Sequence, residues 1–268
     1  MQKRLRLMVV AAHPDDETLG FGGVLARYAS GGVETFLVTA TRGQRGRYQA
    51  HRFGDDAHPG GDALGAIRER ELRQAAGELG VAHVRVLDYE DQHLDRADPR
   101  EAAVLIAAEI RAARPDVVLT FPPDGAYGHP DHIAVSQFAT AAIVEAASGP
   151  GGHRVSKLYY LAWGERLWAA YQRAFKKLVS VVDGVERQAT PWPEWAITTV
   201  IETGAWAPQI WRAVACHASQ VAASSALEGL AAHDRQSLWE SLSFYRAFSL
   251  VNGGRRVETD LFEGCDAE

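Results

Sequence analysis

Two His-Pro-Asp triplets hold the residues of this chain that are best suited to catalysis. The first belongs to the run His-Pro-Asp-Asp-Glu at residues 13–17, and the second to Tyr-Gly-His-Pro-Asp-His at residues 127–132. Two imidazoles and one carboxylate can hold a catalytic zinc ion and leave a fourth position open for water. The same trio also suits non-haem iron, so the residue types alone leave the metal open.

Composition narrows the kinds of ligand and of partner. The chain has 268 residues with only two cysteines, Cys216 and Cys265, against ten histidines and 34 carboxylates. A metal site in this chain must therefore use imidazole and carboxylate rather than thiolate. The net charge of −6 gives no basic surface for a nucleic acid, and we expect no nucleic-acid partner.

No segment has the length of a membrane span or of a secretory signal. The apolar run at residues 7–12 follows basic residues, but six residues are too few for the hydrophobic part of a signal peptide. No other stretch approaches the length that crosses a bilayer. We expect a cytoplasmic protein that makes no membrane contact.

Strand and helix patterns alternate through the first half of the chain and must position the two triplets. The predicted strands are residues 5–12, 34–41, 83–89 and 117–121, and the predicted helices are 22–30, 66–79, 99–113 and 132–147. Such alternation predicts an α/β fold with a mostly parallel sheet flanked by helices, and ligands at the carboxyl ends of the strands. Both triplets follow predicted strand ends, so we expect them to meet.

The glycines after the first strand do not form a dinucleotide-binding fingerprint. Gly20 and Gly22 would require a third glycine at the position occupied by Leu25. The three acidic residues of this turn would also repel a pyrophosphate at the start of the helix. We therefore expect neither NAD nor FAD.

The second half of the chain differs in composition from the first. A short Ser-Gly-Pro-Gly-Gly loop occupies residues 148–152, and all seven tryptophans follow it. We predict a single domain over residues 1–268, with a metal-binding core at 1–147 and a Trp-rich C-terminal completion or cap at 148–268. The Pro-Trp-Pro-Glu-Trp run at residues 191–195 can stack on a sugar or pack between subunits, and we favour a homo-oligomer because tryptophans are more often packing residues.

The motifs together resemble those of the LmbE-like, or PIG-L-type, zinc-dependent N-deacetylases. The resemblance rests on residues 12–19, Gly22-Gly23, Arg68 with Glu71, residues 127–132, and His-Ala-Ser-Gln at 217–220. It implies a Rossmann-like α/β fold with zinc at the strand ends. It also implies hydrolysis of an N-acyl group, usually acetyl, from an amino sugar or its conjugate.

The resemblance implies a metal site and a base in the first triplet. His13, Asp16 and His132 would bind one Zn²⁺ per subunit, with other divalent metals left open. Asp15 would be the general base, because a carboxylate that binds the metal cannot also keep a lone pair free for the water proton.

The second triplet and Tyr127 would stabilise the transition state. By resemblance Tyr127 donates to the oxyanion, and His129 is a charged or hydrogen-bonding partner. Asp131 orients His129 or a metal ligand. For Glu17 we favour the plain interpretation of a carboxylate at a helix N-terminus.

Three further residues are candidate substrate contacts. Arg42 lies in a loop at residues 42–52 that carries four arginines and no acidic residue, which suits an anionic or hydroxyl-rich group. Arg68 is a candidate by resemblance, and an ordinary helix pair with Glu71 is the alternative. His217, in a predicted helical stretch at 206–220, either lines the pocket or supports the fold. Gln44 stands where many family members have glutamate, and this departure puts the sugar contacts of that glutamate in doubt.

The leading hypothesis is a zinc amidohydrolase acting on an N-acetylglucosamine-type unit, a small-molecule substrate. The alternatives are an amidase of a thiol-sugar conjugate or of an N-acyl antibiotic sugar, a non-haem iron oxygenase, and a metal-stabilised sugar-binding module. The alternation of strands and helices argues against the oxygenase hypothesis, and the adjacent Asp15 and Asp16 argue against a sugar-binding module without catalysis. The residues do not decide whether Asp15 or His129 protonates the leaving amine.

Overall fold

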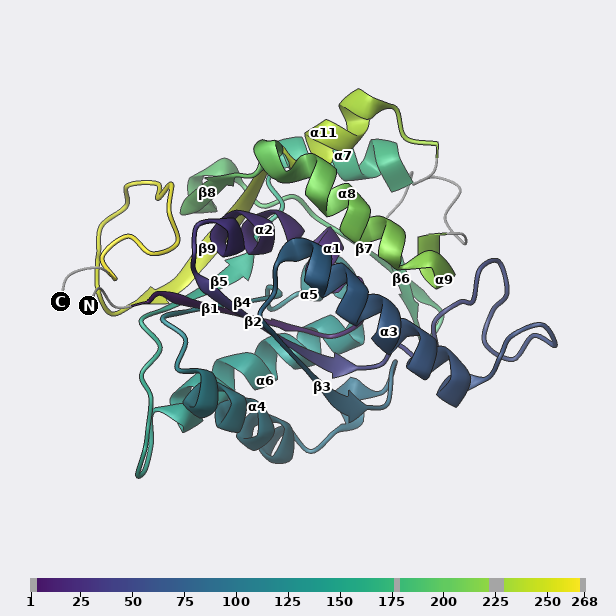
Figure 1. The fold of residues 1–268 in the computed structure, drawn as a ribbon, viewed down its shortest axis with the longest axis horizontal. Coiled ribbons are helices and arrows are strands. Elements are labelled where there is room, and N and C mark those ends of the chain that lie inside the picture. Colours follow the sequence, from purple (N-terminus) through teal and green to yellow (C-terminus); the bar gives the residue numbers. More distant parts are fainter. Residues whose placement is uncertain (1–3, 176–178, 222–228, 266–268) are drawn as a thin grey trace.

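A seven-stranded sheet forms the centre of the molecule (Figure 1). The computed structural model describes residues 4–175, 179–221 and 229–265. The strands of the sheet are β1 (Arg6–Ala11), β2 (Glu34–Thr41), β3 (His83–Tyr89), β4 (Val117–Thr120), β5 (Lys157–Leu161), β8 (Thr199–Glu202) and β9 (Ser241–Ser249). Their order is β3-β2-β1-β4-β5-β9-β8. The first five are parallel, and β9 runs antiparallel to both of its neighbours.

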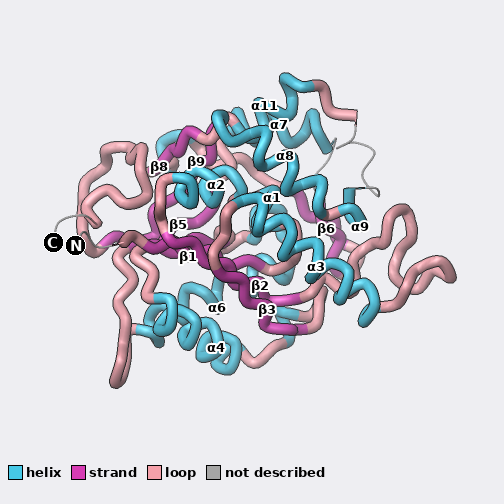
Figure 2. The backbone as a smooth tube through the Cα atoms, in the orientation of Figure 1, coloured by secondary structure: helices cyan, strands magenta, loops and turns pink. Residues whose placement is uncertain are grey.

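Helices cover both faces of this sheet. They are α1 (Asp16–Leu19), α2 (Gly22–Ser30), α3 (Gly61–Leu79), α4 (Pro99–Ala113), α5 (Gly125–Gly128), α6 (Pro130–Ala146), α7 (Glu165–Phe175), α8 (Ala207–Cys216), α9 (Ala218–Val221) and α11 (Ala232–Trp239). Helices α4 and α6 pack together on one face, whereas α2, α3 and α8 lie on the other (Figures 1 and 2). Short 3-10 turns lie at Leu94–Arg96, Glu194–Ala196 and Gly204–Trp206.

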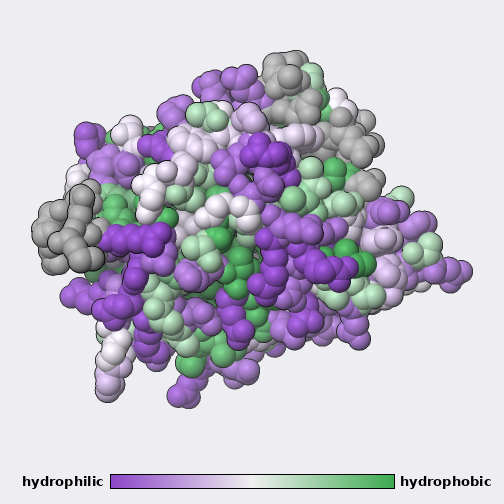
Figure 3. Space-filling model, in the orientation of Figure 1, coloured by the Kyte–Doolittle hydropathy of each residue, from purple (hydrophilic) through white to green (hydrophobic). Residues whose placement is uncertain are grey.

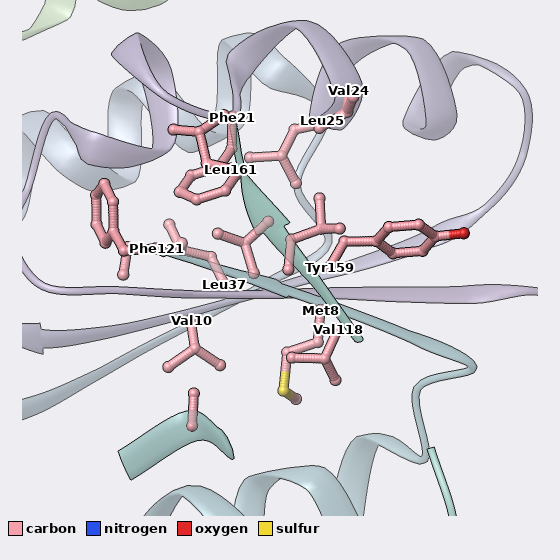
Figure 4. Packing of buried hydrophobic residues seen from close by; sticks show 14 of the residues in the cluster. Met8, Val10, Phe21, Val24, Leu25, Leu37, Val118, Phe121, Tyr159 and Leu161 are labelled. Carbon is pink, nitrogen blue, oxygen red and sulfur yellow. The ribbon is translucent and has the colours of Figure 1, made fainter. Parts of the chain in front are cut away.

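The central strands are buried on both faces, as their apolar composition requires. All residues of β1 from Leu7 to Ala11 are at most 1% exposed, and β4 is buried throughout. Figure 4 shows Met8, Val10 and Val118 pointing to one side of the sheet, and Phe21, Leu25 and Leu161 packing on the other. A parallel strand with helices on both faces needs such a continuous apolar run. The apolar core therefore fixes where β1 and β4 end, and with them the site.

The mostly parallel α/β sheet predicted from the sequence is confirmed, and the boundaries of three helices differ. Helix α3 begins at Gly61, five residues earlier than predicted, and α6 begins at Pro130. Proline suits the first helical position because its missing N–H would have no partner there. The predicted helix at 206–220 breaks at His217, whose φ of −81° and ψ of 52° are not helical.

The second half of the chain completes the same sheet. It supplies β5, β9 and β8, together with a separate hairpin of β6 (Val179–Val182) and β7 (Val185–Gln188). In Figure 1 this hairpin lies near α9, far from the two termini. Since both halves share one sheet, we retain the single domain over residues 1–268 as a proposal.

No helix within the described ranges is long and apolar enough to cross a bilayer. The face in Figure 3 carries hydrophilic residues over most of its area, with hydrophobic residues scattered among them.

Candidate metal centre and active site

Side chains with chemical function gather beyond the carboxyl ends of three strands. Strand β1 ends before His13, β4 ends before the loop that carries Tyr127, and β3 ends two residues before Asp91. In a parallel sheet these ends share one edge, so side chains distant in sequence come together.

His13, Asp16 and His132 converge as a metal-binding group. Nδ1 of His13 lies 3.3 Å from Nε2 of His132, which lies 3.4 Å from Oδ1 of Asp16. The third separation, from His13 Nδ1 to Asp16 Oδ2, is 3.6 Å. Tetrahedral ligands with bonds of about 2.1 Å stand roughly 3.4 Å apart, so the three residues fit a zinc-sized ion. All three are buried, at 2–8% exposure.

Hydrogen bonds from outside the trio orient two of these ligands. Oδ2 of Asp16 accepts from the backbone N–H groups of Ala12 and His13, at 3.1 and 2.8 Å. Nε2 of His13 lies 2.9 Å from Asp131 and 3.2 Å from Asp91. A carboxylate on the far nitrogen of a metal-binding histidine fixes its tautomer, so Nδ1 of His13 would be the atom that faces a metal bound by the trio. Asp131 thus supports His13 through its side chain.

A second group that could hold a metal, His13 with His129 and Asp131, fits less well. The Asp131 carboxylate already accepts from the N–H groups of Gln92 and Leu94, at 2.7 and 3.1 Å, besides its contact with His13. Nδ1 of His129 accepts from the Asp131 backbone N–H at 3.2 Å. These atoms are engaged within the protein, so the first group is the better candidate for binding a metal.

The charges around His13 stabilise one another. Burial lowers the pKa of His13, but the hydrogen bonds and charges of Asp131, Asp91 and Asp16 outweigh it and raise that pKa well above its usual value. Burial likewise raises the pKa of Asp16, and the neighbouring His132 and His13 bring it well below its usual range. Asp16 is therefore an ionised carboxylate, as a metal ligand must be, and a metal bound by the trio would displace the extra proton of His13, because a ligand imidazole is neutral.

Asp15 differs sharply from its neighbour Asp16. Its backbone has the left-handed conformation, with φ at 105° and ψ at −24°. Arg68, which is 4% exposed, donates from Nη2 to Oδ2 of Asp15 at 3.1 Å and to the carbonyl of Pro14 at 2.5 Å. Burial raises the pKa of Asp15 to about 6, although the charge of Arg68 opposes this. A carboxyl with that pKa can accept and return a proton near neutral pH.

Glu17 is a buried partner of His217, a contact that our interpretation of a simple helix N-terminal carboxylate did not include. It lies in the first turn of α1 with no exposure, and its Oε1 is 2.7 Å from Nε2 of His217. Its Oε2 accepts from the backbone N–H of Asp15 at 2.9 Å. Glu17 therefore holds the strained backbone of Asp15, and His217 balances its charge.

Tyr127 and His129 are hydrogen-bond donors beside the trio. Burial, followed by the charges of Asp16 and Asp15, raises the pKa of Tyr127 well above its usual value, so the phenol keeps its proton. Burial and the neighbouring His13 and His132 lower the pKa of His129 to about 3. His129 is therefore neutral, and since its Nδ1 accepts a hydrogen bond, its proton is on Nε2.

The loop that carries Tyr127 has an unusual backbone and support from the β6–β7 hairpin. Gly125, Ala126 and Gly128 all have positive φ, between 66° and 73°. Ser180 donates to the carbonyl of Tyr127 at 3.1 Å, and Arg187 donates to that of Gly128 at 3.3 Å. The hairpin, which the sequence analysis did not identify, thus helps to position a candidate catalytic side chain.

A small cavity of about 150 Å³ opens beside these groups. Its lining includes Asp15, Asp16, Tyr127 and His132. An apolar wall completes it, formed by Leu19, Gly20, Phe121, Trp163 and Tyr171. The sequence analysis missed the wall because its aromatic residues resemble ordinary core. It also missed Asp91, although the position of Asp91 just after a predicted strand was a usable signal.

The three candidate substrate contacts do not line this cavity within the part of the chain that the structure describes. Arg42 pairs with Asp88 and Glu69, with Nε at 2.9 and 3.3 Å from their carboxylates. Arg68 contacts Asp15, and His217 contacts Glu17. Their roles toward a substrate stay predictions, whereas two of them support the candidate base.

Glycines 43 and 46 make room for Arg68. A Cβ on Gly43 would lie 2.0 Å from Nη1 of Arg68, and one on Gly46 would lie 2.6 Å from it. Nη1 also donates to the carbonyl of Gly43 at 2.8 Å. Gln44, between them, donates to the carbonyl of Tyr89 at 3.1 Å. The glycines therefore secure the guanidinium against the backbone beside Asp15.

Comparisons with known proteins agree with this geometry. Residues 8–143 match the family described as PIG-L, GlcNAc-PI de-N-acetylase. A 1D-myo-inositol 2-acetamido-2-deoxy-alpha-D-glucopyranoside deacetylase from Kineococcus radiotolerans is 34% identical, over 97% of this chain and 82% of that protein. One from Rhodococcus jostii is 33% identical, over 97% of this chain and 98% of that protein.

Solved structures share the fold. A conserved protein from Thermus thermophilus has a TM-score of 0.64 at 25% identity, over 93% of this chain and 97% of that one. The 4-carboxy-2-hydroxymuconate hydratase from Pseudomonas putida has a TM-score of 0.68 at 20% identity, over 93% and 99% of the two chains. The second likeness concerns the fold alone, because the named reaction of that protein is a hydration.

Proposed function

Because this chain belongs to the GlcNAc-PI de-N-acetylase (PIG-L) family, we propose that it removes the acetyl group from an N-acetylglucosaminyl unit joined to a polyol such as myo-inositol. It is a hydrolase of an N-acetyl amide on a GlcNAc-type sugar, as its relatives are. We propose Zn²⁺ as the metal, one ion per subunit on His13, Asp16 and His132.

One observation carries the proposal, namely the separation of roles between adjacent carboxylates. Asp16 faces His132 at 3.4 Å within the metal-binding group, whereas Asp15 points to Arg68 and lines the cavity. A sugar-binding module stabilised by a metal would need the metal-binding group with Asp16. It would have no use for Asp15, a second carboxyl with its pKa near 6. The separate roles of Asp15 and Asp16 therefore favour hydrolysis over sugar binding without catalysis.

Asp15 acts as the base in this scheme. A divalent metal, when bound, lowers the pKa of water to about 7 and polarises an amide carbonyl. Asp15 accepts the proton of the attacking water, and Arg68 keeps its carboxyl in place. Base catalysis of this kind contributes about 10²–10⁴ in rate.

Tyr127 and His129 stabilise the oxyanion that develops on the carbonyl oxygen. Tyr127 keeps its phenolic proton, and neutral His129 offers the proton on Nε2. Each such donor contributes about 10²–10³ in rate. Since His129 has a pKa of about 3, we assign protonation of the leaving amine to Asp15, which returns the proton it accepted.

The experiment is amine release from a panel of substrates by the purified protein. The panel holds the N-acetylglucosaminyl inositol named above, free N-acetylglucosamine, diacetylchitobiose, a cysteinyl thiol-sugar conjugate and an N-acyl glycopeptide sugar. We expect the fastest release from the inositol conjugate, its loss with a chelator and its recovery with Zn²⁺. Oxygen consumption with iron, or metal-dependent sugar binding without amine release, would overturn the proposal.

We also propose a homo-oligomer, since Trp195 is 87% exposed in the single chain. Light scattering during gel filtration measures the mass in solution. A monomer at all concentrations would contradict this part of the proposal.

A further inference from the structure

The apolar wall of the catalytic cavity has no role in the reaction described so far. Its residues line, together with Asp15, Asp16, Tyr127 and His132, a space of about 150 Å³. A protein cavity of that size can hold a benzene molecule. An acetyl group fits easily, whereas an amino-sugar ring with its substituents does not. The sugar must therefore remain outside, with only the acyl group entering.

The wall is firmly held. The rings of Trp163 and Tyr171 stack with centroids 4.7 Å apart and planes 24° apart, and both residues are at most 7% exposed. The hydroxyl of Tyr171 donates to the carbonyl of Leu19 at 2.5 Å, and the carbonyl of Trp163 accepts from the backbone of Trp192 at 2.8 Å. Closely packed side chains yield little space to an added methylene group.

The indole of Trp163 is also unusual in its hydrogen bonding. Its Nε1–H is buried and has no partner among the described residues. An unpaired buried donor is unfavourable in the free protein, and a polar atom of a bound group can relieve the cost. Trp163 therefore brings to the cavity lining a bulky, tightly packed ring system and an unpaired N–H donor.

We propose that Trp163, stacked on Tyr171, forms the end of an acyl pocket and restricts the enzyme to short acyl groups. The proposal rests on the proposed function, since it concerns the acyl group of that same amide. Trp163 is then a residue that determines specificity, because it touches the acyl chain and not the sugar. Longer acyl groups are rejected because their added methylene groups meet the two stacked rings.

The test compares Trp163→Ala with the wild-type enzyme on a series of N-acetyl, N-propionyl, N-butyryl and N-hexanoyl glucosaminyl inositols. A methylene group that fits or clashes in an apolar pocket changes kcat/KM by about 10–200-fold. We expect the wild type to prefer acetyl over butyryl by at least about tenfold. The variant should lose most of this preference and gain absolute activity on the longer chains.

Two further variants separate size from hydrogen bonding and from general damage. Trp163→Phe keeps a ring but removes the N–H, so the preference for acetyl should persist while kcat/KM on acetyl falls. Trp206→Ala removes a tryptophan that does not line the cavity and whose Nε1 donates to the Ser30 hydroxyl at 3.0 Å, and it should leave the series unchanged. Circular dichroism and metal content confirm folding, and Trp163→Leu replaces the alanine variant if that one does not fold.

The outcomes are distinct from those for the proposed function. If the wild type releases no amine from any member of the series, the proposed function fails. If it hydrolyses the acetyl compound but a folded Trp163→Ala or Trp163→Leu keeps the wild-type ratio of acetyl to butyryl, the acyl-pocket inference alone is wrong. Inhibition of the wild type gives a check without mutation, because acetate should bind more tightly than hexanoate.

Discussion

Asp15 and Asp16 are adjacent in sequence, but the structure gives them opposite environments. Asp16 faces two imidazoles, which hold its pKa below the usual range, whereas burial raises that of Asp15 to about 6. The left-handed backbone of Asp15, at a φ of 105°, turns the two side chains apart. Such strain persists only where surrounding contacts hold it, and here Glu17 and Arg68 supply them.

Replacement of the base separates catalysis from metal binding. Asp15→Asn should keep the metal, because Asp15 is outside the metal-binding group, and should lower kcat by about 10²–10⁴. Metal content by mass spectrometry and the rate of amine release are the two measurements. Near wild-type turnover in a metal-loaded variant would disprove the base assignment.

Asp91 should affect the metal without touching it. It lies 3.2 Å from Nε2 of His13, and loss of such a supporting carboxylate weakens metal affinity by about 10–100-fold. We therefore expect Asp91→Ala to release Zn²⁺ more readily to a chromophoric chelator in a competition titration. Asp88→Ala, at the end of the same strand and paired with Arg42, is the control. Equal affinities in the two variants would show that Asp91 does not support the site.

At the scale of elements, the end of α8 is joined to the first turn of α1. The link is the contact between His217 and Glu17, both at most 2% exposed. The segment after His217 is also fixed to α3, because Glu71 accepts from the backbone and hydroxyl of Ser219 at 2.8 and 2.7 Å. These contacts join the His-Ala-Ser-Gln motif to α1 and to α3, next to Asp15.

Loss of His217 should destabilise the fold strongly. Removing one partner of a buried pair costs about 3–5 kcal/mol, because the other charge stays buried. We expect that loss for His217→Ala in urea unfolding, with partial recovery when Glu17→Gln is added. His83→Ala breaks a pair with Glu34 in which the histidine side chain is 57% exposed, and should cost about 1 kcal/mol or less. A loss for His217→Ala as small as that of the control would contradict the buried pair.

The strands could be predicted well because apolar runs and alternating patterns in the local sequence mark where they begin and end. The predicted strands at 34–41 and 83–89 match β2 and β3, and the apolar run before His13 is β1. The two triplets indicated a shared metal site, and the family resemblance implied His13, Asp16 and His132 as its ligands, which lie together in space. The contacts of Glu17 and Trp163 could not be predicted, since each depends on partners brought close only by the folded chain. The position of Asp91 after a strand marked it as a candidate for the site, but its contact with His13 depends on the fold in the same way.

For the whole molecule, a buried polar cluster joins the last strands to the C-terminal segment. Glu258, at 1% exposure, accepts from Lys157, Tyr159 and Asn252 at 2.7–2.8 Å. Burial raises the pKa of Glu258, but the hydrogen bonds from Lys157, Asn252 and Tyr159 lower it to about 2. At pH values above the ordinary pKa of glutamate, the charged form of Glu258 therefore stabilises the folded protein.

Acid should remove this stabilisation. Because the pKa of Glu258 is depressed on folding, its contribution is complete above about pH 4.5 and is lost as the pH falls toward about 2. The contribution amounts to roughly 3 kcal/mol. Urea unfolding from pH 6 to pH 2 should show a flatter dependence for Glu258→Gln than for the wild type. Parallel curves would contradict a charged, paired Glu258.

The fold by itself does not specify the reaction. The hydratase of similar fold, with a TM-score of 0.68, shows that one α/β scaffold carries different chemistries. Family membership and the placement of Asp15 beside His13, Asp16 and His132 carry the functional conclusion. The proposed function therefore depends most on a metal held by that trio and used for amide hydrolysis.

The decisive experiment is a titration of Zn²⁺ into chelator-treated protein, in which release of amine from the N-acetylglucosaminyl inositol is followed at each addition. We expect negligible release without metal and a linear rise that saturates at one equivalent of Zn²⁺ per chain, and His132→Ala should show no such rise. Full-rate release of amine from the metal-free protein, or an unaltered titration in His132→Ala, would mean that the trio does not hold a catalytic metal.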